Sequence, residues 1–364
     1  MAEKHYFACA NSAKGFQNMF DLNLQGLKKI FILKGGPGTG KSTLMKKVGK
    51  IYADKDYDVE YIHCSSDPDS LDGVIVRELS VGIVDGTAPH VIEPKTAGAI
   101  EEYVNLGTAW DIELLENKTD EIQAVQKQIS ECYPKAYETF AAALKIHDEW
   151  EHIYIENMDF EKADKLTERV CDTLLGDCEK QDGGVTRHRF FGGSTPNGAM
   201  DYVVNITENC KKRYFIKGRP GSGKSTMLKK ILRKAEDLGL EVEVYHCGFD
   251  PNSLDMILIP KLEWCIFDST APHEYEPSRE GDSVIDMYAE LIKPNTDEQY
   301  EQKLNAIKKR YKETVATGTS YLKKAKELHD VLEQYYIAAT DYSIIEKTTS
   351  DVVERIAERE KRGR

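Results

Sequence analysis

The chain has 364 residues, 40% of them hydrophobic and 30% charged, which predicts two or three globular domains and excludes collagen-like, low-complexity and disordered proteins. The 62 acidic residues outnumber the 49 basic ones, and the net charge of −13 makes a nucleic-acid partner unexpected. The eight cysteines form no C-x-x-C pair, and no apolar run approaches the roughly 18 residues of a membrane helix, so we expect a cytoplasmic protein without a disulfide framework or membrane insertion.

The sequence contains one unit twice. At an offset of 183 positions, GGPGTGKST at 35–43 matches GRPGSGKST at 218–226, and residues 5–94 share 34 identities in 90 positions with residues 188–277. Further along, the matches continue at an offset of 182. They pair His147 and Asp148 with His329 and Asp330, Tyr154 and Ile155 with Tyr336 and Ile337, and Asp159 with Asp341. A repeat of this length indicates two similar domains, which we place at residues 1–182 and 183–364.

Each half begins with strands that alternate with helices. A short apolar run precedes each glycine-rich segment, a helix rich in lysine and apolar residues follows it, and two more apolar runs come later. The predicted strands are residues 30–33, 59–62 and 81–84 in the first half and 214–216, 242–245 and 264–267 in the second, and the helices begin at Lys41 and Lys224. This alternation favours an α/β fold with a parallel, doubly wound sheet flanked by helices in each domain.

Each half ends in a long helical arm, at about 111–180 and 297–361, where Gly and Pro are nearly absent and apolar residues recur at helical spacing. Pro134 and Gly318 predict kinks or turns within the arms, and residues 157–159 and 339–341 predict later turns.

The two arms differ in charge. Residues 111–177 carry 17 acidic and 7 basic side chains, whereas residues 297–364 carry 13 acidic and 14 basic ones. The basic stretch of the second arm consists of Lys303, Lys308, Lys309, Arg310, Lys312, Lys323, Lys324 and Lys326. It could face the acidic arm, a protein partner or an anionic polymer, and the alternative is a set of solvated helix faces.

Both glycine-rich segments match the pattern G-x-x-x-x-G-K-[ST] between an apolar strand and a helix, the context of a phosphate site. Glycines allow successive amides and the helix N-terminus to face phosphate oxygens, and the lysine adds a positive charge. The predicted phosphate-binding residues are Gly35, Gly36, Pro37, Gly38, Thr39, Gly40, Lys41, Ser42 and Thr43, and Gly218, Arg219, Pro220, Gly221, Ser222, Gly223, Lys224, Ser225 and Thr226. A glycine turn without a ligand is the alternative reading.

These loops resemble the Walker A motif of P-loop nucleoside triphosphatases. Asp85 and Asp268, each at the end of an apolar strand, resemble the Walker B aspartate. The resemblance implies that ATP and Mg²⁺ bind, with Ser42 and Ser225 as magnesium ligands and the two aspartates acting through water. An aspartate in this place is otherwise a turn or cap residue. As a whole, the chain resembles a bacterial family of tandem P-loop proteins for which an ATPase activity is only inferred.

The chain departs from two better-known groups of that superfamily. AAA+ ATPases have a catalytic Glu directly after the Walker B aspartate, but Gly86 and Ser269 stand there in this chain. Tandem ion-pump and cell-division ATPases have a second lysine inside the loop, where this chain has Gly36 and Arg219. Other residues must therefore position water or a substrate hydroxyl.

The candidates for that role follow the inferred strands, at the edge where ligands bind in open α/β sheets. They are Asp67, Asp72 and His90 in the first half and Asp250, Asp255 and His273 in the second. Carboxylates and imidazoles can orient the attacking group or accept its proton. The alternative reading makes Asp67 and Asp250 turn residues and Ser70 and Ser253 helix caps. His63 and Cys64 together with His90, and their repeats, could instead bind a transition metal, although a fourth ligand is missing.

Three functions compete. The first is an ATPase whose two sites face each other or alternate and whose turnover moves the helical arms, within an intramolecular pseudo-dimer or a homodimer. The second is a P-loop kinase that phosphorylates a small molecule near Asp67 or Asp250. The third is a nucleotide-gated scaffold that recruits a protein partner through the arms. GTP is an alternative nucleotide, since residues 117–120 spell Asn-Lys-Thr-Asp, although they lie in a predicted arm helix.

Overall fold

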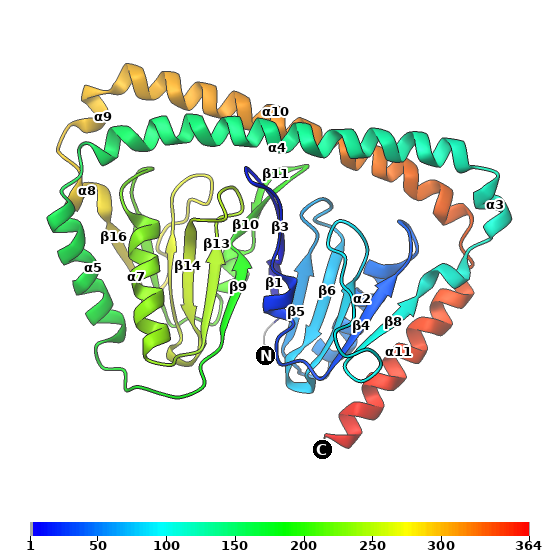
Figure 1. Cartoon of the computed structure of the whole chain (residues 1–364). Coiled ribbons are helices and arrows are strands. Elements are labelled where there is room, and N and C mark those ends of the chain that lie inside the picture. The colour runs from blue at the N-terminus through cyan, green and yellow to red at the C-terminus, as the bar shows by residue number, and fades with distance from the viewer. Residues whose placement is uncertain (1–2, 364) are drawn as a thin grey trace.

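The computed structural model describes residues 3–363 and has a mixed α/β fold built around one 12-stranded sheet, to which each half contributes six strands (Figure 1). The strands are β1 (Glu3–Phe7), β4 (Lys29–Lys34), β5 (Val59–His63), β6 (Leu71–Val76), β7 (Val81–Asp85) and β8 (Glu101–Asn105), followed by β9 (Thr186–Phe190), β12 (Lys212–Lys217), β13 (Val242–His246), β14 (Leu254–Ile259), β15 (Trp264–Asp268) and β16 (Asp282–Asp286). Within these residues, no helix combines the length and the apolar character needed to cross a membrane.

The strand order is the same in both halves, read outward from the centre of the sheet. It is β1-β5-β6-β7-β4-β8 on one side and β9-β13-β14-β15-β12-β16 on the other. The two central strands, β1 and β9, meet antiparallel through Phe7 and Phe190. The repeat in the sequence is therefore also a repeat in strand order.

The prediction of a fully parallel sheet is wrong at β6 and β14. Each of these strands runs antiparallel to both of its neighbours, whereas the other pairings within each half are parallel. Residues 71–76 and 254–259 are buried throughout, so each forms an inner strand directly after a turn. Ser70 and Ser253 accordingly precede strands and do not cap helices.

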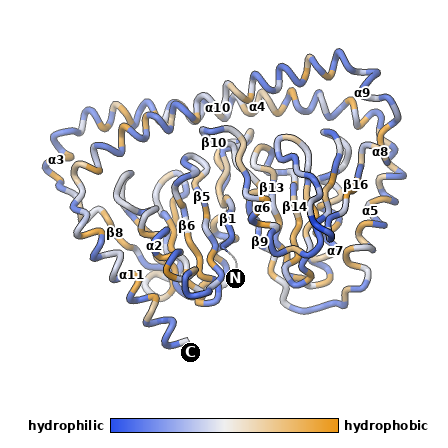
Figure 2. Tube along the Cα trace, turned by 180° about the vertical axis from the view of Figure 1, so that it is seen from behind, coloured by the Kyte–Doolittle hydropathy of each residue, from blue (hydrophilic) through white to orange (hydrophobic). Residues whose placement is uncertain are grey.

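Helices cover one face of the sheet in each half. In the first half they are α2 (Lys41–Ala53) and α11 (Tyr342–Arg362), whose Leu44 and Val352 share a core with β4. In the second they are α7 (Lys224–Asp237) and α5 (Phe160–Leu175). The other face carries one core that continues across both halves beneath the short helices α1 (Phe20–Asn23) and α6 (Val203–Ile206). Figure 2 shows the hydrophobic residues concentrated in the inner strands.

Two long helices, α4 (Thr119–Ile155) and α10 (Glu301–Ala338), run side by side across both halves of the sheet (Figure 1). α4 crosses to the second half, and α5 then packs on α7; α10 crosses in the opposite direction, and α11 packs on α2. The halves thus exchange their C-terminal helices. The predicted turns at 157–159 and 339–341 are confirmed, since they separate α4 from α5 and α10 from α11.

The predicted turns at Pro134 and Gly318 are wrong, because α4 is one helix through Pro134 and α10 is one helix through Gly318. Gly318 is needed instead for the crossing of these helices. A Cβ atom there would lie 2.4 Å from Cε1 of Phe140 on α4. Along the same pair, Arg310 of the basic stretch forms an ion pair with Glu149 of the acidic arm at 2.5 Å.

A buried arginine joins the halves at the centre of the sheet. Arg189 on β9 is 0% exposed and forms ion pairs with Glu60 of the first half at 3.1 Å and Glu243 of the second at 3.0 Å. Its guanidinium stacks on the ring of Tyr6, the residue at the equivalent position of the first half, with 4.1 Å to the ring centroid. Although burial acts to raise it, the charges of Arg189 and Lys4 hold the pKa of Glu243 down to about 2.

Candidate phosphate-binding sites

Each glycine-rich loop joins a strand to a helix, β4 to α2 and β12 to α7. Gly38 and Gly40 have φ of 70° and 82°, and Gly221 and Gly223 have φ of 76° and 87°. These left-handed conformations favour glycine, and alternating them with right-handed residues makes consecutive amides face one point. α2 and α7 begin immediately afterwards, so their N-terminal amides face the same region. Both loops therefore have the backbone shape that an anionic ligand requires.

The two lysines lie over their own loops. The Lys41 ammonium donates hydrogen bonds to the carbonyl oxygens of Gly35 and Gly36 at 2.9 and 2.8 Å and lies 3.6 Å from the Asp85 carboxylate. In the second half, Lys224 donates to the carbonyl of Arg219 at 2.9 Å and lies 3.5 Å from Asp268. Each loop thus has one cation beside one carboxylate at a strand end.

Arg219 does not face the inside of its loop. Its guanidinium donates two hydrogen bonds to the Asp297 carboxylate, at 3.1 and 2.9 Å, and lies 4.8 Å from the centroid of the Tyr288 ring. The side chain is thereby fixed against α8 (Met287–Leu291) and α9 (Thr296–Gln299).

Hard oxygen ligands gather beside each lysine. The Ser42 hydroxyl accepts a hydrogen bond from the Leu71 amide at 3.0 Å, which fixes it next to Asp72. Gly73 pairs with Val84 in the β6–β7 register, so Asp72 and Asp85 come side by side at the end of these strands. The second half repeats this arrangement with Ser225, Leu254, Asp255 and Asp268, and there the hydroxyl accepts at 2.9 Å. A hydroxyl and two carboxylates fit Mg²⁺, which prefers hard oxygen ligands.

The two histidine candidates have different partners. His90 Nε2 lies 3.3 Å from the Asp72 carboxylate, and although burial acts to lower it, the charge of Asp72 raises the pKa of His90 to about 9. His273 instead lies 2.6 Å from Asp201, whose equivalent in the first half is Asn18.

The second-half carboxyl also has a shifted pKa. Burial and the nearby charge of Asp268 raise the pKa of Asp255 to about 7, although the charge of His273 acts to lower it. The two sites therefore have the same strand register but different histidine contacts.

Asp67 and Asp250 lie in the turns after β5 and β13. Asp67 accepts a hydrogen bond from the Ser70 hydroxyl at 2.9 Å, so the turn interpretation describes it correctly. Its carboxylate also lies 3.6 Å from Lys326 on α10, and that of Asp250 lies 3.0 Å from Lys14. Both candidates therefore point toward neighbouring elements as well as toward their own turns.

His63 is poorly placed to bind a transition metal. Its Nδ1 is hydrogen-bonded to the Pro68 carbonyl at 2.9 Å and its Nε2 to His5 at 2.8 Å. His246 has the same pair of contacts, with Pro251 and His188. Both nitrogens of each ring therefore have hydrogen-bond partners, whereas a metal ligand requires a nitrogen that is free to bind the ion.

The sequence did not indicate that each loop is touched by the long helix from the other half. A Cβ atom on Gly36 would lie 2.9 Å from Tyr336 of α10, and one on Gly38 would lie 2.8 Å from Ile337. In the second half, a Cβ atom on Gly221 would lie 2.5 Å from the carbonyl oxygen of Glu151 on α4. The ends of the crossing helices thus rest directly on the loops.

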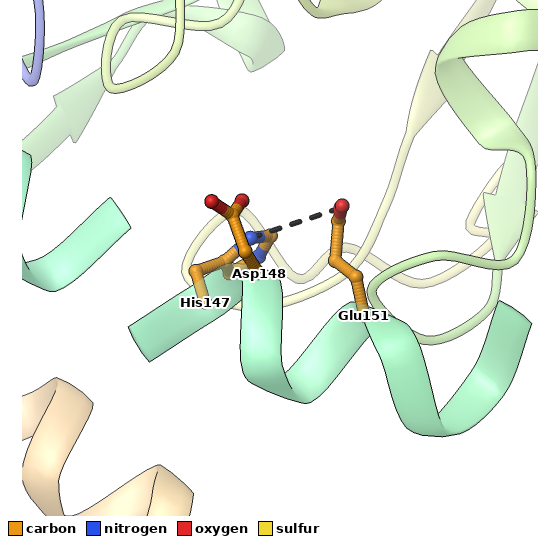
Figure 3. Close-up of side chains that lie close together, drawn as sticks. All are labelled: His147, Asp148 and Glu151. Carbon is orange, nitrogen blue, oxygen red and sulfur yellow. Dashed lines mark ion pairs between the residues drawn. The ribbon is translucent and has the colours of Figure 1, made fainter. Parts of the chain in front are cut away.

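Those helix ends carry two matched clusters. His147, Asp148 and Glu151 project from one side of α4 (Figure 3), with His147 Nδ1 3.7 Å from the Glu151 carboxylate. On α10 the equivalent residues are His329, Asp330 and Glu333, and the corresponding distance is 3.8 Å. The sequence signal for them is that His147, Asp148 and Glu151 are identical to His329, Asp330 and Glu333 at the offset of 182. Comparison of the chain with protein-family models, with curated proteins and with solved structures found no match.

Proposed function

We propose that each half is a P-loop domain that binds a nucleoside triphosphate with Mg²⁺, and that the chain hydrolyses ATP at these two sites. The observation that carries this proposal is the double occurrence of one assembly. A glycine loop with two left-handed residues opens a helix, a lysine lies over the loop beside a strand-end aspartate, and a serine hydroxyl accepts a hydrogen bond from the first amide of the strand that carries a second aspartate.

Each part of the assembly has a defined role in this proposal. The loop amides and the N-terminus of α2 or α7 hold the phosphates, and Lys41 or Lys224 exchanges its loop carbonyls for phosphate oxygens. Ser42 or Ser225 binds the magnesium ion, while Asp85 or Asp268 orients its water ligands. Bound Mg²⁺ supplies charge that stabilises the transferring phosphoryl group.

Nucleotide binding would also affect the crossing helices. The loops contact Tyr336 and Ile337 of α10 and Glu151 of α4, so any adjustment of a loop around phosphates changes the surface on which the helix end rests. We infer that the sites are coupled to these helices, whose outer faces would bind a protein partner. The proposal includes no nucleic acid.

The test is phosphate release from Mg·ATP by the full chain. The unaltered protein should release phosphate without an added acceptor, and Lys41→Ala and Lys224→Ala should each lose activity at one site, with the double variant at background. Lys50→Ala on α2, whose side chain is 76% exposed, is the matched control and should be unchanged.

Other outcomes would select other functions. ADP formation that requires an added small-molecule acceptor would identify a kinase. The absence of an acidic residue directly after Asp85 and Asp268 favours this alternative. Tight binding with turnover as slow as that of an unassisted GTPase would identify a scaffold. Activity that survives in the Lys41→Ala, Lys224→Ala double variant would refute the proposed sites.

A further inference from the structure

The crossing helices bring side chains from one half to the glycine loop of the other. α4 belongs to the first half of the sequence, yet its last turns lie on the loop at 218–226. α10 belongs to the second half, and its last turns lie on the loop at 35–43. The surroundings of each loop therefore include a helix from the other half of the sequence.

The two copies of the sequence are more similar where the helices contact the loops than along the rest of the long helices. Residues 147–159 are identical to residues 329–341 at six of 13 positions, whereas residues 119–146 are identical to 301–328 at only four of 28. Five of the six lie in the last turns that approach the loop: His147, Asp148, Glu151, Tyr154 and Ile155. A purely structural role in helix pairing would not single out this end, because α4 and α10 pack against each other along their length.

His147 lies one turn before Glu151 on the same side of α4 (Figure 3), with Nδ1 3.7 Å from the Glu151 carboxylate. Glu151 in turn lies against Gly221 of the second loop. The charges that act on His147 agree with this position, because burial and the positive charge of Lys224 lower the pKa of His147, while Asp148, Asp250 and Asp268 act in the opposite direction. Lys224 and Asp268 are the loop lysine and the strand-end aspartate of that site.

Glu151 connects the same cluster to the loop backbone. Its backbone carbonyl oxygen lies 2.5 Å from the position that a Cβ atom on Gly221 would take, and burial together with Asp148 raises the pKa of Glu151. The carboxylate faces Nδ1 of His147 at 3.7 Å. A carboxylate on that side favours the tautomer with its proton on Nδ1, which leaves Nε2 as the proton acceptor.

We propose that the clusters act across the halves, with His147 as the general base at the site of Lys224 and His329 as the general base at the site of Lys41. This inference rests on the proposed function. It supplies the water-orienting group that Gly86 and Ser269 cannot provide. Glu151 and Glu333 are positioning residues that orient the imidazoles.

In the proposed reaction, water attacks the γ-phosphate of ATP. The water oxygen forms a bond to the γ-phosphorus, and the bond between that phosphorus and the β,γ-bridging oxygen breaks, so that ADP leaves. One water proton passes to Nε2 of the histidine and then to solvent, and the other remains on the released phosphate. General-base assistance of this kind contributes roughly 100-fold or more to a rate.

The experiment crosses histidine substitutions with loop substitutions in the full chain. In the Lys41→Ala background only the second loop is intact, so His147→Gln should lower the remaining kcat about 100-fold while KM changes less than about threefold. In the Lys224→Ala background, His329→Gln should have that effect and His147→Gln should not. His152→Gln is the matched control, because this histidine lies on the same helix with its side chain 66% exposed.

A second measurement does not depend on turnover. With Mg²⁺ and a nonhydrolysable ATP analogue, the Lys41→Ala protein should gain hydrogen-exchange protection around Glu151, and the Lys224→Ala protein around Glu333. Loss of kcat in the wrong background, or binding without protection of the expected helix end, would overturn this inference while leaving the proposed function standing. Failure of the unaltered protein to bind the analogue would overturn both.

Discussion

The burial of Arg189 allows a quantitative prediction about the interaction that joins the two halves. Its guanidinium is wholly buried between Glu60 and Glu243 and stacks on Tyr6. Replacement by Met keeps much of the volume and the apolar contact but removes the charge. Two buried carboxylates would then keep Arg77 and Lys4, both partially exposed, as their charged partners, together with hydrogen bonds from the Tyr6 and Tyr245 hydroxyls.

The magnitude follows from the carboxylate pKa values. The ordinary pKa of a glutamate is about 4.3, and that of Glu243 is about 2, so at neutral pH the arrangement around this one group stabilises the fold by about 3 kcal/mol. Breaking a buried ion pair by removing one partner costs about 3–5 kcal/mol. We therefore expect Arg189→Met to lower the free energy of unfolding by about 3–5 kcal/mol at pH 7.5.

The sign of the pH dependence provides the control. Depressed carboxyl pKa values stabilise the unaltered protein above about pH 4.3, and this stabilisation is lost as the pH falls toward 2. In Arg189→Met the unpaired carboxylates take up protons at higher pH, so the deficit should shrink by at least about 1 kcal/mol between pH 7.5 and pH 4.

Urea unfolding of the full chain at both pH values measures these differences. Arg169→Met is the matched control, because its ion pair with Glu290 is exposed, and it should cost less than about 1 kcal/mol. A deficit for Arg189→Met below about 1 kcal/mol at pH 7.5, or one that grows on acidification, would refute the reasoning.

Three further predictions concern the crossing and the loops. Gly318→Ala places a Cβ atom 2.4 Å from Phe140 and should lower stability by about 1–3 kcal/mol, an effect that Phe140→Leu should relieve in thermal unfolding; additive effects of the two changes would contradict the packing account. Arg219→Ala breaks the contact with Asp297 but should weaken ATP binding in calorimetry less than about threefold, unlike Lys224→Ala, and an equal loss would mean that Arg219 binds phosphate. Ser42→Ala should raise the Mg²⁺ concentration needed for half-maximal activity about tenfold or more in a Lys224→Ala background, Ser42→Thr should retain the unaltered requirement, and identical magnesium titrations would exclude the hydroxyl as a ligand.

The loops and their strands could be predicted because their signals are local. A glycine pattern before Lys41 and Lys224, with apolar runs on either side, specifies strand, loop and helix within about 20 residues. The direction of β6 could not be read in this way. Its residues 71–76 include Asp72 and Gly73 among the apolar ones, so the sequence pattern predicts no strand there, and the tight turn at 67–70 reverses the chain.

The exchange of the C-terminal helices could not be predicted either. Helical periodicity in 119–155 and 301–338 indicates which residues face a partner but not which half supplies that partner. Gly318 illustrates the difficulty, because the same residue is compatible with a kink or with the close approach of Phe140. His147 was visible as half of a matched pair with His329, but its place beside Lys224 depends on a helix that spans the molecule.

Calorimetric titration of the full chain with Mg·ATP measures whether both glycine loops bind the nucleotide. We expect saturable heat from two sites in the unaltered protein, from one site in Lys41→Ala and in Lys224→Ala, and from none in the double variant. A titration of the unaltered protein to millimolar Mg·ATP that releases or absorbs no binding heat would contradict this expectation, and so would a double variant that binds as tightly as the unaltered chain.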